Sequence, residues 1–346
     1  MAGSTGVLES AQFIAQHAEY VSIDVDACHD VAETIYDSMQ AKSYSTATWS
    51  THPLNPKSKT KKTVDWIFLV DLLNFSFWSD VDTNDTGRAS TQRFTVVLDG
   101  QEWTGYWSLC AAVNRAIEQD GIDITNPAVW NTLSDADLAA VFRSDTKEQV
   151  PMLSERIACM RQAGQVLTDN FDGSFANVID FAAGSAVGLV NLIVKWFACF
   201  RDEVTYKGRS VRILKRAQIL VSDIWACFDQ ASYGSFHDID QITMFADYRV
   251  PQILHSLGVI KYSAQLEKHV RDLELLEYGS DREVELRGCS IWSVELIKLQ
   301  ILAAHPGQNI NSVLIDFYLW DTAKEIQGKS EIQNAIPCHR TRSIFY

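Results

Sequence analysis

The feature of this chain that most limits its fold is a succession of segments with helical periodicity. Beyond the first third of the sequence, apolar residues recur at steps of three and four in one segment after another. In SVRILKRAQILVSDIWACF (210–228), Ile213, Leu220 and Ile224 lie on one side of a helix. The early segment VLESAQFIAQHAEYV (7–21) has the same spacing. No repeat of fixed period is present, so the pattern predicts a mainly helical globular body.

The first third of the chain adds a short β-hairpin. QRFTVVLDGQEWTGYWSLC (92–110) contains an apolar run, a turn at Asp99 and Gly100, and a second run rich in aromatic residues. Asp-Gly is a favoured pair for the tight turn of a hairpin. Just before it, WIFLVDLLNFSFW (66–78) is so continuously apolar that a buried strand and a buried helix are equally compatible with it. We therefore predict a mainly α fold with a small β-sheet.

The chain shows no sign of a boundary between domains. Its 346 residues contain 47% hydrophobic and 21% charged side chains, which is ordinary globular composition and excludes a disordered protein. Separate domains are usually joined by exposed linkers rich in proline, glycine and polar residues, and no such linker is present. We predict a single domain over 1–346 with room for two lobes, an N-terminal lobe (1–150) with the small sheet and a helical lobe (151–346).

The excess of acidic residues limits the partners of the protein. Forty-four acidic and 30 basic residues give a formal net charge of −14. Such a surface repels polyanions, so stable nucleic-acid binding is not expected, although a small anion can bind in a local basic pocket. The lysine-rich segment STHPLNPKSKTKK (50–62) is interpreted as a solvated loop, with a phosphate site as the alternative.

The cysteines and the apolar segments bear on the compartment. The seven cysteines are odd in number and form no CxxC pair, which is typical of reduced, mostly buried thiols in an intracellular protein. The most apolar stretch, 181–200, contains Asn191 and Lys195, which are costly in lipid, so we predict a buried core helix and no membrane contact. No signal peptide is recognisable, and the protein is predicted to be cytoplasmic or nuclear. The oligomeric state stays open.

Three aspartates stand among apolar residues in FHDIDQITMFADYRVP (236–251). If this stretch is helical, Asp238 lies at the helix entrance, and Asp240 and Asp247 lie two turns apart. Aspartate at a helix entrance commonly caps free N–H groups. The alternative is a carboxylate that backbone donors hold ionised while it faces a substrate cavity. The residues alone leave both interpretations open.

Several well-known catalytic signatures are missing, and aromatic residues are unusually placed. The sequence contains no GxxxxGK[ST], GxSxG, HExxH or GxGxxG motif after a strand, so it gives no support for triphosphates, dinucleotides or catalytic zinc. The clusters NFSFW (74–78) and DFYLWD (316–321) place rings beside an amide or a carboxylate. Such pairs can stack on a flat heterocycle and read its edge, although most single rings simply fill cores.

Seven segments together resemble the queuosine salvage protein family. They are HPLNP (52–56), WIFLVDLLNFSFW (66–78), KRAQILVSDIW (215–225), ITMFADYRVPQ (242–252), EVELRGCSIWSVE (283–295), DFYLWD (316–321) and HRTRSIFY (339–346). The resemblance runs in order from about His52 onward. It implies an N-glycosidase that hydrolyses queuosine 5'-phosphate and frees queuine for reinsertion into tRNA. It also implies a helical body similar to the helix-hairpin-helix DNA glycosylases, with no metal and no cofactor.

The resemblance also implies roles for individual residues. Cleavage of an N-glycosidic bond builds positive charge on the ribose, which a carboxylate can stabilise while it activates water. We expect Asp238 in this role, with Lys215 as a facing cation and Asp247 as an orienting group. The expected substrate-binding residues are Asn74, Phe75, Trp78, Asp316 and Asp321 for the base or its cationic amine, and His52, Lys215, Tyr248 and Arg249 for the phosphate, with Arg340 and Arg342 as weaker phosphate candidates.

The chemistry of the base adds one constraint. A 7-deazapurine has carbon where guanine has N7, so departure of the base cannot be helped by protonation there, and donors must reach its oxygen or its remaining nitrogens. Two alternatives to this small-molecule enzyme stay open. One is a glycosylase acting on a nucleic acid, which the net charge disfavours, and the other is a non-catalytic nucleotide-binding protein.

Overall fold

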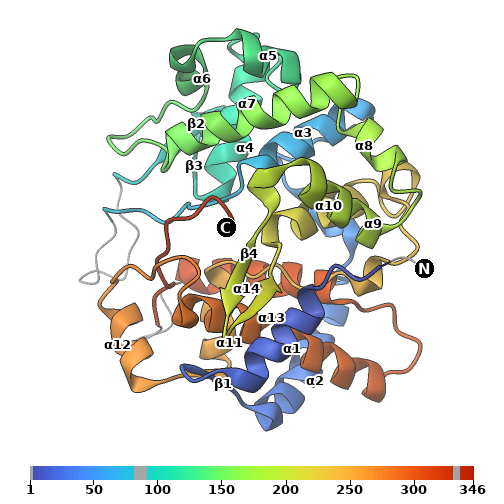
Figure 1. Cartoon of the computed structure of the whole chain (residues 1–346), viewed down its shortest axis with the longest axis vertical. Coiled ribbons are helices and arrows are strands. Elements are labelled where there is room, and N and C mark those ends of the chain that lie inside the picture. Colours follow the sequence, from blue (N-terminus) through green and yellow to red (C-terminus); the bar gives the residue numbers. More distant parts are fainter. Residues whose placement is uncertain (1–2, 82–91, 330–335) are drawn as a thin grey trace.

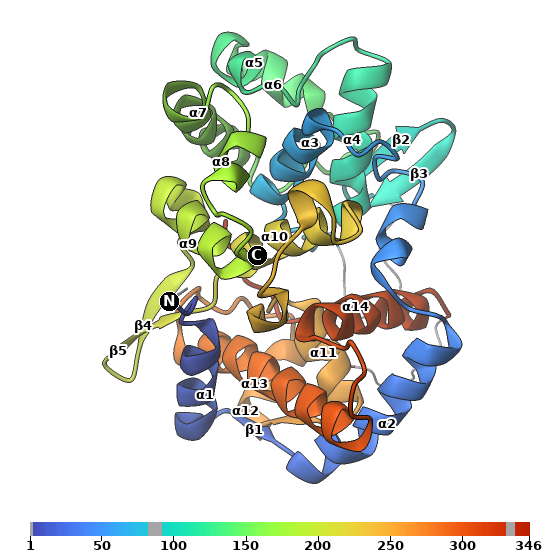
Figure 2. The ribbon, with the colours of Figure 1, turned by 90° about the vertical axis from the view of Figure 1, so that its right-hand side faces the viewer.

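The computed structural model describes residues 3–81, 92–329 and 336–346. Figures 1 and 2 show two stacked parts along the longest axis of the molecule. One end is built from α3 to α8 with the hairpin β2–β3, and the other from α1, α2 and α11 to α13. Helices α10 and α14 lie between these parts in both views.

The helices and strands have the following bounds. The α-helices are α1 (Val7–His17), α2 (Val25–Ala41), α3 (Lys61–Leu72), α4 (Tyr106–Glu118), α5 (Pro127–Thr132), α6 (Asp135–Val141), α7 (Leu153–Asn170), α8 (Ala176–Asp180), α9 (Ala186–Trp196), α10 (Lys215–Cys227), α11 (Arg249–Ser256), α12 (Ala264–Arg271), α13 (Asp281–Ala304) and α14 (Ser312–Lys329). Short 3₁₀ helices are η1 (Thr46–Thr51), η2 (Ala198–Phe200), η3 (Ser232–Gly234) and η4 (Ile239–Gln241). The strands are β1 (Val21–Ile23), β2 (Thr95–Leu98), β3 (Gln101–Thr104), β4 (Glu203–Tyr206), β5 (Arg209–Arg212) and β6 (Ile260–Tyr262).

The mainly helical fold is confirmed, and the strands of the described residues form three two-stranded sheets. The predicted hairpin is β2–β3, paired antiparallel from Thr95 opposite Thr104 to Leu98 opposite Gln101. Asp99 and Gly100 both have positive φ, at 52° and 76°, as a type I′ turn requires. The antiparallel pairs β4–β5 and β1–β6 form the other two sheets.

The N-terminal helices pack on a helix from near the other end of the chain. Helices α1 and α2 both contact α13. Gly288 permits the close approach of α1, because a Cβ at this position would lie 2.6 Å from Ile14. The buried Glu285 side chain accepts hydrogen bonds from the backbone N–H groups of residues 19–21. These contacts join the two halves of the chain, and the division into lobes at residue 150 stays a prediction.

The ambiguous apolar segments are now assigned. Residues 66–72 belong to α3, and the chain continues from Asn74 without regular structure. The apolar stretch 181–200 forms the core helix α9 and the turn η2, as predicted. Within the described part of the chain, no helix combines the length and the hydropathy needed to cross a bilayer. The described cysteines form no disulfide with one another, and all except the half-buried Cys338 are buried.

The prediction of one helix through residues 238–249 is wrong. Only η4 forms there, residues 242–246 are irregular and buried, and α11 begins at Arg249. The backbone N–H of Thr243 is donated to Gln218, and that of Phe245 to Asp316, so side chains from other helices take the bonds that an α-helix would make. The segment therefore stays extended inside the protein.

Candidate active site

Three buried cations hold the chain where α3 ends. Arg216 donates to the carbonyl of Leu72, and Arg156 donates to those of Leu73 and Phe75. The ammonium of Lys215 lies 3.2 Å from the carbonyl oxygen of Asn74. The free carbonyls at a helix C-terminus carry partial negative charge, which explains the cations. The turn at residues 72–75 is thereby fixed, with Lys215 at its centre.

Lys215 stands among carboxylates rather than beside a single partner. It begins α10 and is 4% exposed. Burial lowers the pKa of its ammonium, and the charges of Asp247, Asp71 and Asp316 oppose this effect, in that order. We call Asp71, Asp223, Asp247 and Asp316 the acid cluster, since each interacts electrostatically with at least one other member.

Asp247 is the member of the acid cluster with the best-fixed orientation. Its Oδ1 accepts hydrogen bonds from the backbone N–H groups of Arg249 (2.7 Å) and Val250 (3.1 Å) at the start of α11. The preceding carbonyl, of Ala246, is bound by the buried Arg287 at 2.8 Å. No group in the described ranges 3–81, 92–329 and 336–346 donates a hydrogen bond to Oδ2 of Asp247. One oxygen is thus anchored at the start of α11, and the other accepts no such bond from the described residues.

Asp71 and Asp223 form the deepest part of the cluster. Oδ1 of Asp71 accepts from the amide of Asn74 at 3.1 Å, and its Oδ2 is buried without a partner among the described atoms. Burial raises the pKa of Asp71 to about 7. Burial and the neighbouring Asp71 raise the pKa of Asp223 well above its usual range, against a hydrogen bond from Trp49. Two buried neighbouring carboxylates of this kind favour sharing one proton.

Asp316 projects from α14 toward the extended segment 242–246. It is 5% exposed, and its Oδ1 accepts the backbone N–H of Phe245 at 2.9 Å. Burial raises the pKa of Asp316 well above its usual range, and Asp247 adds to the increase. Further along α14, the half-buried Asp321 accepts a hydrogen bond from the hydroxyl of Tyr44. Both predicted residues of DFYLWD are therefore polar groups with fixed surroundings.

Aromatic rings line the same region. His52 stacks on Trp107 with 3.3 Å between ring centroids and an angle of 9° between the planes. Tyr106 and Trp320 pack edge-on against Trp107. We call His52, Tyr106, Trp107 and Trp320 the aromatic wall. Asp223 and Asp71 both interact electrostatically with the phenol of Tyr106, which links the aromatic wall to the acid cluster. His52, predicted to bind phosphate, thus belongs to a surface suited to a flat ring.

Several arginines interact with Tyr248, the residue that follows Asp247. Arg249 and Arg93 act electrostatically on the neighbouring Tyr248, and Tyr248 in turn acts on Arg342. We call Arg93, Arg249 and Arg342 the arginine group; all three are half-buried. Asp247 also acts on Tyr248, so the acid cluster and the arginine group meet at this aspartate. Carboxylates near both aromatic rings and guanidinium groups suit a ligand with a polar flat ring and an anionic end.

The structure brings most predicted site residues together, with three exceptions. Lys215, Asp247, Asn74 and Asp316 share the acid cluster and its rim, as described above. Asp238 lies elsewhere: its oxygens accept from the Ser185 hydroxyl at 2.6 Å and from the Ala186 backbone N–H at 2.5 Å. It therefore caps α9, and the expected cap on its own segment is wrong because no helix follows it. Asp240 is exposed on η4.

Phe75 and Trp78 are the other two exceptions, and both are packed by cations. The Phe75 ring lies between the guanidinium groups of Arg156 (4.3 Å) and Arg216 (5.0 Å). Trp78 donates its indole N–H to the carbonyl of Thr341 at 2.9 Å and lies under Arg342 at 3.3 Å. These contacts match the core-packing alternative for the two rings.

Sequence reasoning missed the residues that complete the site. They are Asp71, Asp223, Tyr106, Trp107 and Trp320. The two aspartates did leave a signal, because each is an acid inside an apolar helical run at a position that the helix buries. Trp320 lies in the DFYLWD cluster noted in the sequence, whereas Tyr106 and Trp107 left no signal, since rings of this kind are common in cores.

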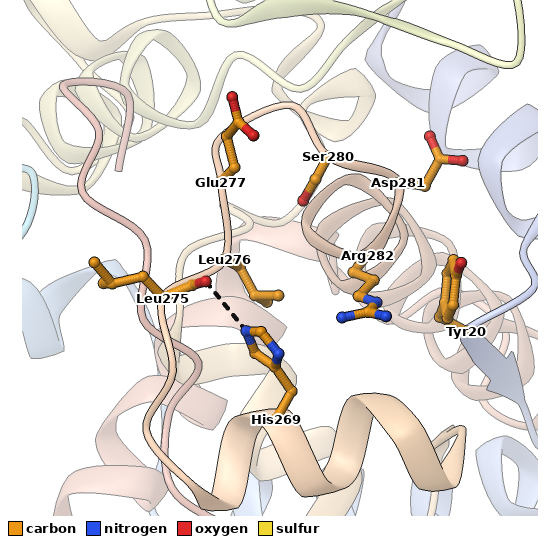
Figure 3. A pocket seen from close by; sticks show the side chains of 8 residues that line it. All are labelled: Tyr20, His269, Leu275, Leu276, Glu277, Ser280, Asp281 and Arg282. Atoms are coloured by element: carbon orange, nitrogen blue, oxygen red, sulfur yellow. Dashed lines mark hydrogen bonds between the residues drawn. The ribbon is translucent and has the colours of Figure 1, made fainter.

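A hollow lies at the surface between α12 and the start of α13. This pocket of about 280 Å³ is lined by Tyr20, His269, Leu275, Leu276, Glu277, Ser280, Asp281 and Arg282 (Figure 3). Its polar groups are already engaged: His269 bonds the carbonyl of Leu275 and pairs with Glu274, and Arg282 lies over Tyr20. It includes no predicted site residue.

The described residues contain no group of three or more His, Cys, Asp or Glu side chains that could hold a metal ion.

Comparison with known proteins adds a family and close relatives. The model of the family described as "Queuosine salvage protein" matches residues 54–346. The "Queuosine 5'-phosphate N-glycosylase/hydrolase" of Schizosaccharomyces pombe is 45% identical over 349 residues, covering 98% of this chain and 99% of the relative. Proteins of the same name from Mus musculus (42%; 98% of each chain) and Sphaerobacter thermophilus (35%; 99% of this chain and 98% of the relative) also match.

Proposed function

Because the chain belongs to the queuosine salvage protein family, we propose that it hydrolyses the N-glycosidic bond of queuosine 5'-phosphate and releases queuine. The products are the free base and ribose 5-phosphate, and the base becomes available for tRNA modification. The names of relatives that cover nearly the whole chain support this reaction. The structural observation that carries the proposal is that Asp247, a member of the acid cluster, also acts on Tyr248, which connects it to the arginine group.

Asp247 is the carboxylate best arranged to act on the ribose. As the base departs, positive charge develops at C1' of the ribose, and a fixed carboxylate lowers the energy of that state. Backbone N–H groups anchor one oxygen of Asp247, which supports a role for the other oxygen beside the reacting carbon. The same oxygen can take a proton from the attacking water. Lys215 is the nearby cation that balances the carboxylate.

The two flanks of Asp247 suit the two ends of the nucleotide. Asp316 and Asp321, with His52 and the aromatic wall, would receive the base and its cationic amine. Arg249 and Arg342, with the hydroxyl of Tyr248, would bind the 5'-phosphate. This arrangement gives an acidic protein a local basic patch, as binding of a small anion requires.

Two finer expectations from the resemblance stay proposals. One is the catalytic role of Asp238. Its contacts with α9 favour a structural role, and the mechanism above therefore gives the catalytic role to Asp247. The other is a relation between the helical body and the helix-hairpin-helix DNA glycosylases. The mainly helical build of the described residues is compatible with that relation.

The proposed reaction is tested by incubating the purified protein with queuosine 5'-phosphate, without added metal, and following free queuine by chromatography. We expect queuine and ribose 5-phosphate in equal amounts, and no guanine from guanosine 5'-phosphate as a matched nucleotide. If no queuine forms at high protein concentration although the nucleotide still binds, the protein is instead the non-catalytic nucleotide-binding protein of the second alternative.

A further inference from the structure

We propose that Asp316 is the acid that protonates the departing base, while Asp247 acts on the ribose and on water. The inference rests on the proposed hydrolysis of queuosine 5'-phosphate and adds a proton donor to it. Neither the family match nor the names of the relatives assign a role to Asp316.

A single stretch of backbone orients both carboxylates. The N–H of Phe245 holds Oδ1 of Asp316 at 2.9 Å, and Asp247 follows Phe245 two residues later. Asp316 is 5% exposed, and no described group donates a hydrogen bond to its Oδ2. Asp247 and Lys215 both act electrostatically on Asp316, which supports placing this side chain where the base and the ribose would meet. A carboxyl group with one anchored and one free oxygen is suited to deliver a proton in a fixed direction.

The two carboxylates have unlike surroundings. Asp247 is half-buried at the N-terminus of α11, where two N–H groups and the positive end of the helix dipole favour negative charge. Asp316 is buried with one donor, and both Asp247 and Asp321 act to keep it neutral. Burial raises the pKa of Asp316 well above its usual range, in agreement with this geometry. Neighbouring acids in unlike surroundings commonly divide the roles of acid and base.

The chemistry of the leaving group needs such an acid. A 7-deazapurine cannot accept a proton at position 7, so the bond to ribose breaks more easily if a proton reaches another nitrogen or the oxygen of the base. In the step, the bond between C1' and the base nitrogen breaks with its electron pair going to the base. The proton of Asp316 passes to the base, and the oxygen of water bonds to C1' while Asp247 takes the water proton. Exchange with solvent then returns a proton to Asp316 and removes one from Asp247.

The test compares a base that needs protonation with a leaving group that does not. Asp316→Asn keeps the shape of a neutral carboxyl but cannot transfer a proton. We expect it to lower kcat for queuosine 5'-phosphate by about 100- to 10,000-fold. With 4-nitrophenyl riboside 5-phosphate, whose phenolate leaves unprotonated, the loss should be roughly 10-fold or less. Asp247→Asn is the matched control and should impair both substrates, since stabilisation of the ribose is needed in each case.

A pH profile of kcat/KM on queuosine 5'-phosphate gives a second readout. Activity of the wild type should fall as pH rises through the pKa of the essential acid, and Asp316→Asn should lose that limb. Equal losses on the two substrates together with an unchanged limb would overturn the role of Asp316. If the wild type does not hydrolyse the nitrophenyl substrate, the decrease of kcat/KM at high pH alone tests the role of Asp316. Failure of the wild type to release queuine would instead remove the proposed function itself.

Discussion

Asp238 shows how one residue can be recognised as important and still be given the wrong neighbours. The sequence placed it beside a run of apolar residues, where a cap and a catalytic carboxylate look alike. In the structure it is 3% exposed, and both oxygens are bound by Ser185 and Ala186 at the start of α9. A carboxylate that closes a helix N-terminus typically contributes about 1 kcal/mol to stability. We propose Asp247 for the catalytic role because it is half-buried and only one of its oxygens accepts hydrogen bonds from the described residues.

Substitution of the two aspartates separates these roles. We expect Asp238→Ala to lower the free energy of unfolding by roughly 1–3 kcal/mol, since it also leaves buried donors unpaired. The folded fraction should keep its kcat for queuine release. Asp247→Ala should remove turnover and leave the cooperativity of urea unfolding intact. The measurements are urea titrations and single-turnover assays on both variants. Loss of turnover in well-folded Asp238→Ala would return the catalytic role to Asp238.

At the scale of elements, the end of α3 is the part of the site on which most depends. Its carbonyls are bound by Arg156, Arg216 and Lys215, and none of these three cations has a carboxylate within 4.0 Å among the described residues. The bonds therefore run from charged side chains to the backbone, which makes them stronger than neutral ones. The turn at 72–75 is positioned by α7 and α10, and through it Asp71 and Asn74 are positioned as well.

Arg216→Met tests this bracing. The substitution leaves the carbonyls of Leu72 and Cys199 without their donor inside the core, so we expect the free energy of unfolding to fall by about 2–5 kcal/mol. Arg201→Met is the control: it removes the same charge from an exposed arginine and should cost about 0.5 kcal/mol or less. Urea unfolding followed by tryptophan fluorescence measures both. Equal stability of the two variants would argue against a bracing role for Arg216.

The elements also show where sequence reasoning succeeds. The hairpin β2–β3 was predictable because Asp99 and Gly100 determine the turn locally, and α9 because Asn191 and Lys195 argued against a membrane span. The segment 242–246 was not predictable, since its backbone donors are bound by Gln218 and Asp316, far away in the sequence. For the same reason, sequence reasoning selected Lys215 and Asp316 as candidate site residues but could not foresee the contacts that lead us to propose Asp247 in place of Asp238.

For the whole molecule, the distribution of charge matters more than its sum. The formal charge of −14 coexists with an arginine group beside Asp247. A long polyanion meets repulsion over most of the surface, whereas a single phosphate meets only the local arginines.

This distribution predicts a preference for small anions that can be measured. An electrophoretic mobility shift with tRNA at low salt should show no complex at micromolar protein, the condition that most favours electrostatic binding. Queuosine 5'-phosphate should bind in the same buffer, as measured by calorimetry. A tRNA complex under these conditions would support the alternative of a glycosylase acting on nucleic acid.

The packing of Trp78 has a consequence for how the protein is made. Its indole is bound to Thr341, and the neighbouring Ser76 bonds with Ser343, 267 residues further along the chain. During translation, residues 75–78 therefore leave the ribosome long before the segment that covers them. Contacts of such long range form slowly, and apolar surface exposed in the meantime promotes aggregation. Nascent chains that stop short of residue 339 should thus be substrates for chaperones, with the catalytic centre assembled only after the final segment has been synthesised.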